Sequence, residues 1–229
     1  MMIRSKWENG KTKMWFKFKY STRNLVRLCQ ENSTDKLTLV VHSEDVDYKP
    51  YFKNSVSITK RKDVDADIHC DLYYTDLGKM DKESYDVILC TGLLEHVPDP
   101  QRLIDDLYNL LKPSGKLILS ASAVFSVHEG PNNFFHFTKF GMRLLLKDFS
   151  RSIIEGSCGP FENIGIQMQR ILIQSKINPL LRPFLEIFAL GFRYLDQLVQ
   201  EQYDHVGVYS DDHKIDSMLP SNIQAIAHK

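Results

Sequence analysis

The chain has 229 residues, of which 43% are hydrophobic and 25% are charged, and this composition is typical of an ordinary globular protein. Lysine plus arginine and aspartate plus glutamate each number 29, so the chain as a whole has no charge excess that would favour nucleic acid as a partner. The length predicts one domain with an elaboration rather than two independent domains.

The N-terminus has no apolar region of the kind found in a signal peptide, and no uncharged apolar run approaches the ~20 residues of a membrane-spanning helix. The four cysteines are far apart and form no CxxC pair. Two of them, Cys70 and Cys90, lie in apolar, strand-like runs. This pattern favours buried thiols in a reducing compartment over disulfides or zinc ligands. We therefore expect a cytoplasmic protein.

The N-terminal segment is strongly basic. Residues 1–27 hold eight lysines or arginines against one acid, and residues 13–20 (KMWFKFKY) interleave lysine with aromatic residues. Such a pattern occurs in segments that touch a membrane surface, an anionic lipid-linked sugar or nucleic acid, and also in solvated N-termini. We expect weak membrane-surface contact at most and no nucleic acid. Residues 20–31 then predict a short helix, so residues 1–35 form a basic segment and helix.

Four strand-like runs follow, at residues 37–42, 55–59, 67–72 and 86–91. The first run begins as a buried strand and continues into the sequence HSED at residues 42–45, without a glycine. The first strand of an α/β nucleotide-binding domain normally ends in a glycine-rich turn, because only glycine lets the backbone approach a cofactor so closely. The start of the chain therefore suggests such a domain with an altered loop.

The centre of the chain has the clearest pattern. Asp99 and Pro100 predict the start of a helix, because aspartate is a frequent N-cap and proline suits the first helical position. Apolar residues then recur at helical spacing: Leu103, Ile104, Leu107, Leu110 and Leu111. Residues 112–115 (KPSG) end the helix, and residues 116–120 (KLILS) are a second buried strand. A strand, a helix and a strand in this order imply a parallel pair with a right-handed crossover.

The remaining elements complete the sheet. A helix is expected to start at Thr138 and to turn four apolar side chains inward: Phe140, Leu144, Leu145 and Phe149. Residues 152–157 and 222–227 are predicted strands, the second of which closes the sheet. The fold class is therefore α/β, with a doubly wound, mostly parallel sheet.

Residues 161–203 read as helical, with interruptions at Pro179 and Pro183. The part from residue 177 onward is expected to be an amphipathic core or lid helix, in preference to a membrane-surface or dimer helix. The main domain is thus expected to span residues 36–229, with a helical insertion at about 161–205.

Residues 85–122 (YDVILCTGLLEHVPDPQRLIDDLYNLLKPSGKLILSAS) resemble the fourth-strand to fifth-strand segment of class I S-adenosylmethionine-dependent methyltransferases. In this segment Ser114 replaces the first glycine of the family's LKPGG turn. Residues 128–146 are similar to a run of the methyltransferase-11-like subgroup, which is often associated with sugar and cell-surface polysaccharide pathways. The resemblance implies a Rossmann-like methyltransferase with S-adenosylmethionine as cofactor. It also implies methyl transfer to a small-molecule or glycan hydroxyl, with polysaccharide biosynthesis as the suggested pathway.

The resemblance places the cofactor beyond the carboxyl ends of the strands, where ligands bind in open parallel sheets. The residues implied are Ser43, Asp45, Thr59, Asp71, Leu72, Thr91, Gly92 and His96. Ser43 and Asp45 stand in the slots of the family's G-x-G turn, and Thr59 stands where the family holds the ribose with an acid. Asp71 keeps the acid that the family pairs with the adenine amino group. The alternatives are that Gly92 only shapes a turn and that Asp71 is a solvated strand-end acid.

His128 follows the predicted fifth strand, across the cleft from the expected methyl group. Methyl transfer to a hydroxyl requires positioning and, for an unactivated alcohol, a base that takes the proton. Histidine titrates near neutrality and suits that task. His128 is therefore the predicted catalytic residue, and the alternative is that it anchors the loop of residues 128–138 to the sheet.

Glu95 and His96 begin the segment after the fourth strand. In some ubiquinone-pathway O-methyltransferases a comparable Glu-His pair, with a further glutamate upstream, helps to bind a divalent metal. Here the upstream slot holds Gly92, which removes one ligand, and a metal needs several fixed donors. We therefore expect no metal, and we expect His96 to pack or hydrogen-bond near the cofactor.

The altered first loop leaves a second function open. In that alternative the chain is a catalytically weak or inactive methyltransferase fold that acts as a binding partner or scaffold. A cofactor titration separates the two functions. A nucleic-acid methyltransferase is disfavoured, because the basic segment is short and no Asn-Pro-Pro-Tyr-like site is present.

Overall fold

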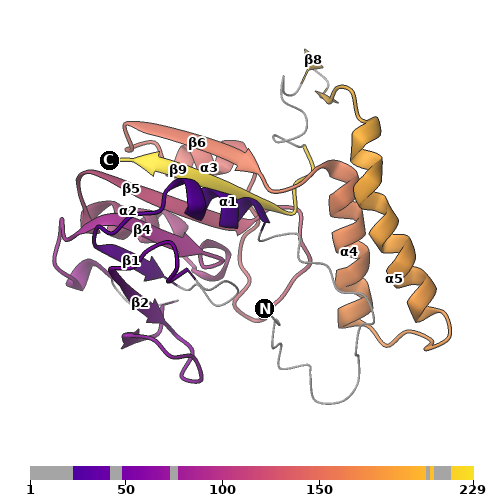
Figure 1. The fold of residues 1–229 in the computed structure, drawn as a ribbon, viewed down its shortest axis with the longest axis horizontal. Coiled ribbons are helices and arrows are strands. Elements are labelled where there is room, and N and C mark those ends of the chain that lie inside the picture. Colours follow the sequence, from indigo (N-terminus) through magenta and orange to yellow (C-terminus); the bar gives the residue numbers. More distant parts are fainter. Residues whose placement is uncertain (1–22, 42–47, 73–76, 205–206, 209–217) are drawn as a thin grey trace.

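A computed structural model describes residues 23–41, 48–72, 77–204, 207–208 and 218–229. Its centre is a seven-stranded sheet with the strand order β3-β2-β1-β4-β5-β9-β6 (Figure 1). The strands are β1 (Thr38–Val41), β2 (Ser55–Thr59), β3 (Ile68–His69), β4 (Tyr85–Thr91), β5 (Leu111–Ser122), β6 (Arg151–Gly156) and β9 (Asn222–His228). Strands β1 to β5 pair in parallel, and β9 runs antiparallel between β5 and β6. The predicted doubly wound, mostly parallel sheet is confirmed.

Helices cover both faces of the sheet (Figure 1). The helix α1 (Arg23–Glu31) buries Leu25, Leu28 and Cys29 against one face. The helices α2 (Pro100–Leu110) and α3 (Lys139–Leu145) contribute to the larger core on the other face. Short 3-10 turns lie at η2 (Leu77–Lys79) and η3 (Leu94–His96), and a two-stranded ribbon is formed by β7 (Tyr203–Asp204) and β8 (Gly207–Val208).

The crossover from β4 through α2 to β5 is formed as predicted. The carboxylate of Asp99 accepts a hydrogen bond from the backbone N–H of Arg102 at 3.1 Å and thereby caps α2. The turn after α2 is absorbed into β5 as an irregularity, because Leu111 pairs with Tyr85 and regular pairing resumes only at Lys116. Within this turn Ser114 has a φ of 64°, a left-handed conformation that favours glycine.

The expectation for α3 is partly wrong. Phe140 and Leu144 are 58% and 69% exposed, whereas Met142 is buried. Phe149 is buried as expected, and Leu145 packs partly buried against the core. The helix is only two turns long, so one buried position at its centre is enough to fix it on the sheet, and its flanking apolar residues face outward.

The helices α4 (Pro160–Gln174) and α5 (Arg182–Gly191), followed by η4 (Phe192–Leu198), pack against each other and stand to one side of the sheet (Figure 1). A helix is present where the sequence predicted an amphipathic core or lid helix, and its role as core or lid stays a prediction. The helix buries Arg182, Glu186 and Ala189, and the guanidinium of Arg182 donates to the carboxylate of Glu186 at 3.0 Å. Large apolar side chains are exposed both on this helix and directly before it: Phe184, Ile187 and Phe188 on α5, and Leu180 and Leu181 just before it.

None of the helices in the described part of the chain is both long and apolar enough to cross a membrane. All four cysteines are free thiols. Cys29, Cys90 and Cys158 are buried and Cys70 is half-buried, which confirms the expectation of unpaired thiols in or near the core.

Candidate functional site

The carboxyl ends of the parallel strands meet at one edge of the sheet, as the pairing register shows. Val41 of β1 is level with Cys90 of β4, and Thr91 is level with Ser120 of β5. Gly92 follows directly, and its backbone N–H donates to the carbonyl of Ser120 at 3.0 Å. Its φ is 59°, and a Cβ added there would meet nothing within 4 Å. The position therefore requires glycine for its backbone conformation and leaves open space in front of it.

The other predicted cofactor residues lie at the same edge where the structure describes them. Thr59 is buried at the end of β2, and its hydroxyl accepts a hydrogen bond from the backbone N–H of Arg61 at 3.2 Å. Asp71 is exposed and Leu72 is buried, two and three residues after β3 ends. Ser43 and Asp45 lie outside the described residues. The edge thus gathers Thr59, Asp71, Leu72, Thr91 and Gly92.

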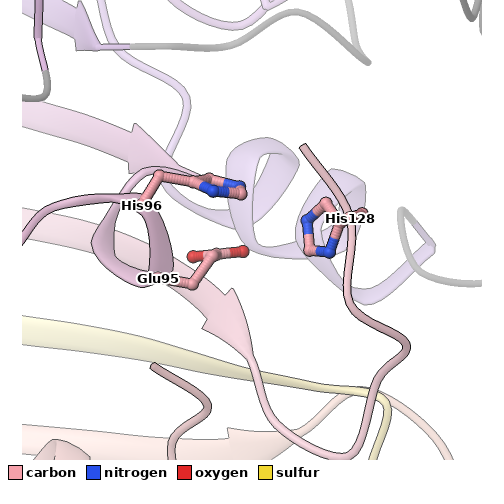
Figure 2. Close-up of side chains that lie close together, drawn as sticks. All are labelled: Glu95, His96 and His128. Atoms are coloured by element: carbon pink, nitrogen blue, oxygen red, sulfur yellow. The ribbon is translucent and has the colours of Figure 1, made fainter. Parts of the chain in front are cut away.

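Beside this edge, Glu95, His96 and His128 lie close together (Figure 2). Each offers one oxygen or nitrogen atom, and these atoms all lie within 4.8 Å of one another. Glu95 and His96 are 2% and 1% exposed and come from η3, directly after β4. His128 is half-buried and comes from the segment after β5. The fold therefore brings the predicted catalytic histidine to the Glu-His pair.

Glu95 is fixed through one of its two carboxylate oxygens. Its Oε1 accepts hydrogen bonds from the backbone N–H of Ser122 at 3.2 Å and from the Ser122 hydroxyl at 2.7 Å. Its Oε2 is buried and has no hydrogen-bond partner among the residues that the structure describes. A buried carboxylate oxygen without a partner is costly, so this atom calls for a ligand or a water molecule.

Both imidazoles are oriented by backbone carbonyls. The Nδ1 of His96 lies 2.5 Å from the carbonyl oxygen of Asn132, and the Nδ1 of His128 lies 3.0 Å from that of Ser126. A carbonyl only accepts hydrogen bonds, so each Nδ1 carries the proton. In the neutral rings the lone pair is then on Nε2, which is the atom that takes up a proton or binds a metal.

His128 is held in its neutral form. Burial lowers the pKa of its imidazole to about 4, and the charges of His96 and Arg170 act in the same direction. Its ring packs edge-on against His96 and Phe125, with centroids 4.9 Å and 5.3 Å apart. At neutral pH the ring is therefore uncharged and has an available lone pair, but it is a weaker base than an ordinary histidine.

The loop of residues 128–138 is fixed by its backbone. The N–H groups of Phe134 and Phe135 donate to the carbonyl of Glu95 at 2.8 and 3.3 Å, and that of Phe137 donates to the carbonyl of Ser122 at 2.8 Å. These bonds join the loop to η3 and to the end of β5. The loop is thus anchored through its backbone, and both roles considered for His128, base and loop anchor, stay predictions.

The helix α4 holds the chain just before His128. Four polar side chains on one face of this helix donate to the segment 124–127: Asn163 and Gln167 to the carbonyl of Val124, Arg170 to the hydroxyl of Ser126, and Gln174 to the carbonyl of Val127. The sequence reasoning missed this contact. The sequence feature that could have predicted this contact is the helical spacing of the four polar residues on a helix that is otherwise rich in apolar residues.

The profile of a family described as a methyltransferase domain matches residues 22–149, which is more than half of the chain. The chain belongs to this methyltransferase domain family. The matched residues include η3 and His128, so the cluster lies inside the methyltransferase domain. The recognition of a class I methyltransferase from the sequence is confirmed.

Curated relatives match over a shorter span. A ubiquinone biosynthesis O-methyltransferase of Pseudomonas savastanoi is 28% identical over 134 residues, which are 55% of this chain and 55% of that protein. A ubiquinone biosynthesis O-methyltransferase of Coxiella burnetii is 55% identical over 40 residues, which are 18% of this chain and 17% of that protein. The methyltransferase thus spans about half the length of the first of these relatives, and less of the second.

Solved structures show the same fold at low sequence identity. A SAM dependent methyltransferase from Archaeoglobus fulgidus has a TM-score of 0.56 and is 14% identical, covering 90% of this chain and 91% of that chain. Phosphoethanolamine N-methyltransferase 2 of Haemonchus contortus, in complex with S-adenosyl-L-methionine, has a TM-score of 0.52 and 16% identity, covering 91% of this chain and 52% of that one. These similarities confirm the Rossmann-like methyltransferase fold.

Proposed function

We propose that the protein is an S-adenosylmethionine-dependent methyltransferase that acts on a hydroxyl group of a small molecule. The observation that carries the proposal is the position of the Glu95–His96–His128 cluster beside the strand ends of a methyltransferase domain. The names of the curated relatives, which are O-methyltransferases, favour oxygen as the acceptor atom. The cofactor follows from the family and is the one bound in a structural neighbour.

The cofactor would lie along the edge formed by Thr59, Asp71, Leu72, Thr91 and Gly92, with His96 beside it. Asp71 is exposed, so an adenine amino group at the strand ends would be able to reach its carboxylate. Leu72 is buried next to it and holds the chain against the core. The open space in front of Gly92 suits a close approach of the cofactor to the backbone. Ser43 and Asp45 belong to the same proposal through the family pattern alone.

The acceptor hydroxyl would lie against His128. In the transfer, the acceptor oxygen attacks the methyl carbon, the bond from that carbon to sulfur breaks, and S-adenosylhomocysteine leaves. The hydroxyl proton must be removed in the same process, and in this proposal Nε2 of His128 would accept it. Because the pKa of His128 is about 4, the proton passes on to solvent rather than staying on the ring.

A small-molecule acceptor has more support than a glycan. Two of the relatives described above carry the name of ubiquinone methylation and one structural neighbour that of phosphoethanolamine methylation, and none of those described above names a sugar. The glycan acceptor and polysaccharide biosynthesis therefore stay predictions from the resemblance of residues 128–146. The scaffold alternative depends on the loop that contains Ser43 and Asp45, which lies outside the described residues.

Weak contact with a membrane surface is part of the proposal. Residues 13–20, on which the sequence-based expectation rests, lie outside the described residues. The helix α5 offers a second surface for such a contact. Phe184 and Phe188 of α5 are exposed, and so is Leu180 just before the helix. The only acid in residues 175–194 is Glu186, which is buried, whereas Lys176 and Arg193 are exposed. An apolar face with basic neighbours suits an anionic bilayer surface. Co-sedimentation with phosphatidylglycerol vesicles should fall in the Phe184→Ser, Phe188→Ser protein; unchanged co-sedimentation would remove this contact.

The proposed reaction is tested with S-adenosyl-L-methionine labelled on the methyl group and two probe acceptors, catechol and methyl glucoside. We expect transfer to catechol, little transfer to methyl glucoside, and loss of turnover in His128→Ala with retained binding of S-adenosylhomocysteine. The matched control is His136→Ala, an exposed histidine of the same loop. Equal turnover in both variants would remove His128 from the mechanism, and exclusive transfer to methyl glucoside would restore the glycan assignment.

A further inference from the structure

The cluster of Glu95, His96 and His128 has the composition of a metal site. Two imidazoles and one carboxylate are the protein ligands of several catalytic zinc sites and of the facial triads that hold other divalent transition metals. The sequence alone predicted no metal, because Gly92 cannot serve as a ligand. That reasoning considered only residues near the Glu-His pair in the sequence. The structure adds His128, which follows β5 in the chain, and Figure 2 shows it beside Glu95 and His96.

The unpartnered oxygen of Glu95 is a second and independent indication. The side chain is 98% removed from solvent, and its Oε1 is already occupied by both hydrogen bonds from Ser122. Its Oε2 is the buried atom that lacks a partner among the described residues, and in Figure 2 the Glu95 carboxylate lies below the His96 ring and to the left of the His128 ring. A bound cation would supply the missing interaction.

Each of the three side chains has a hydrogen-bond partner that fixes its orientation. The ligands of a metal site are oriented by such outer partners in the same way. Metal-bound histidines usually donate their other ring N–H to a carbonyl or carboxylate, which sets the tautomer and aims the remaining nitrogen. His96 and His128 both do so, toward the carbonyls of Asn132 and Ser126. The cluster therefore has three donors and an outer partner for each of them.

We propose that Glu95, His96 and His128 bind one divalent transition-metal cation, of which zinc is the reference case. Ligand atoms on a tetrahedral zinc with bonds of 2.0–2.2 Å lie roughly 3.3–3.6 Å apart. The present separations reach 4.8 Å, so binding draws the three atoms together by at most about 1.5 Å. His128 is the member that moves, because it is half-buried whereas Glu95 and His96 are fully buried. Two further charged side chains affect the pKa of His128: the cation Arg170 lowers it and the anion Glu129 raises it.

Three protein ligands leave an open position on the cation. If the proposed function holds, the acceptor hydroxyl occupies that position and loses its proton to solvent, because a bound cation lowers the pKa of a coordinated oxygen. The resulting oxyanion attacks the methyl carbon while the carbon–sulfur bond breaks. His128 then acts as a ligand rather than as the base.

The binding test uses protein stripped with a chelator and titrated with Zn²⁺ in a calorimeter, and with Co²⁺ in an absorbance cell. We expect one ion per chain. Glu95→Gln keeps the side-chain oxygen that accepts hydrogen bonds from Ser122, so this variant should fold. It should nevertheless bind the cation at least about 100-fold more weakly. The loss of an outer partner alone would weaken metal binding by only about 10- to 100-fold. His128→Ala should show a comparable loss, and His136→Ala should bind as the unaltered protein does.

Three results would overturn the inference: no binding by the unaltered protein, equal binding by the folded variants, or a sulfur-to-cobalt charge-transfer band that places the ion on a cysteine. None of these results depends on methyl transfer. Binding of S-adenosylhomocysteine is measured separately on the metal-free protein. A protein that binds S-adenosylhomocysteine but no cation therefore contradicts only the metal site, and one that binds the cation but no S-adenosylhomocysteine contradicts only the proposed function.

Discussion

The hydrogen bond between Ser122 and Glu95 should make a large contribution to stability for a single hydroxyl. Ser122 is 1% exposed, and its Oγ donates to Oε1 of Glu95 at 2.7 Å. Replacing Ser122 with alanine removes this bond and leaves the longer one from the backbone N–H, at 3.2 Å. The other carboxylate oxygen has no partner among the described residues that could compensate.

The expected loss follows from the kind of bond. A hydrogen bond to a charged group contributes about 1.5–3 kcal/mol when both partners are buried. For a protein of this size, 1 kcal/mol corresponds to about 2–4 °C in the melting temperature. The Ser122→Ala protein should therefore unfold about 3–12 °C below the unaltered protein. In the Glu95→Gln background the same substitution should cost less, because the acceptor is then uncharged.

Thermal unfolding followed by circular dichroism measures the shift, and Ser120→Ala is the matched control. Ser120 is a buried serine of the same strand, and its hydroxyl has no hydrogen bond among the residues that the structure describes. If Ser122→Ala and Ser120→Ala shift the melting temperature equally, the hydroxyl does not stabilise Glu95. An equal cost of Ser122→Ala in both backgrounds would show that the charge of Glu95 plays no part.

Three further predictions concern other parts of the chain. Ser114→Gly should stabilise the protein by about 0.5–1 kcal/mol in urea unfolding, because relief of its left-handed backbone exceeds the added freedom of glycine in the unfolded chain; a destabilised variant would contradict this. Burial raises the pKa of the Cys29 thiol to about 12, so mass mapping should find maleimide on the half-buried Cys70 well before Cys29, and simultaneous labelling would be inconsistent with that burial. Ser43→Gly together with Asp45→Gly should bind S-adenosylhomocysteine more tightly than the unaltered chain, and equal affinity would show that this loop does not limit binding.

The central strands and α2 were predictable because their signals are local. Asp99, Pro100 and the apolar residues that follow fix the start and the buried face of α2 without reference to the rest of the chain. The orientation of α5 was not predictable in this way. Its sequence shows an apolar face, but the residues that it buries are Arg182, Glu186 and Ala189. Packing against α4 decides which face is buried: a Cβ added to Gly165 of α4 would lie 2.6 Å from the carbonyl oxygen of Ala189, and this close approach is a tertiary contact.

The site was predictable only in part, because its individual residues have local signals and their meeting in space does not. His96 and His128 were recognised one by one from the resemblance, and their proximity depends on the path of the chain through α2 and β5. The contribution of Glu95 depends on Ser122, the last residue of β5. Ser122 bonds one carboxylate oxygen of Glu95, and the other oxygen has no partner among the described residues. No local pattern reports such a pairing, so the sequence reasoning named Glu95, His96 and His128 separately and missed that the three side chains meet.

The central claim is that this methyltransferase domain binds the adenosyl cofactor at the strand ends beside Asp71 and Gly92. Calorimetry with S-adenosylhomocysteine tests it directly, on the unaltered protein and on Asp71→Ala. We predict saturable binding of one molecule per chain, weakened by about 10- to 150-fold in Asp71→Ala, because losing a charged hydrogen-bond partner costs about 1.5–3 kcal/mol. Absence of binding at millimolar ligand would contradict the claim and favour the scaffold alternative, and unchanged affinity in a folded Asp71→Ala protein would show that the cofactor does not contact Asp71.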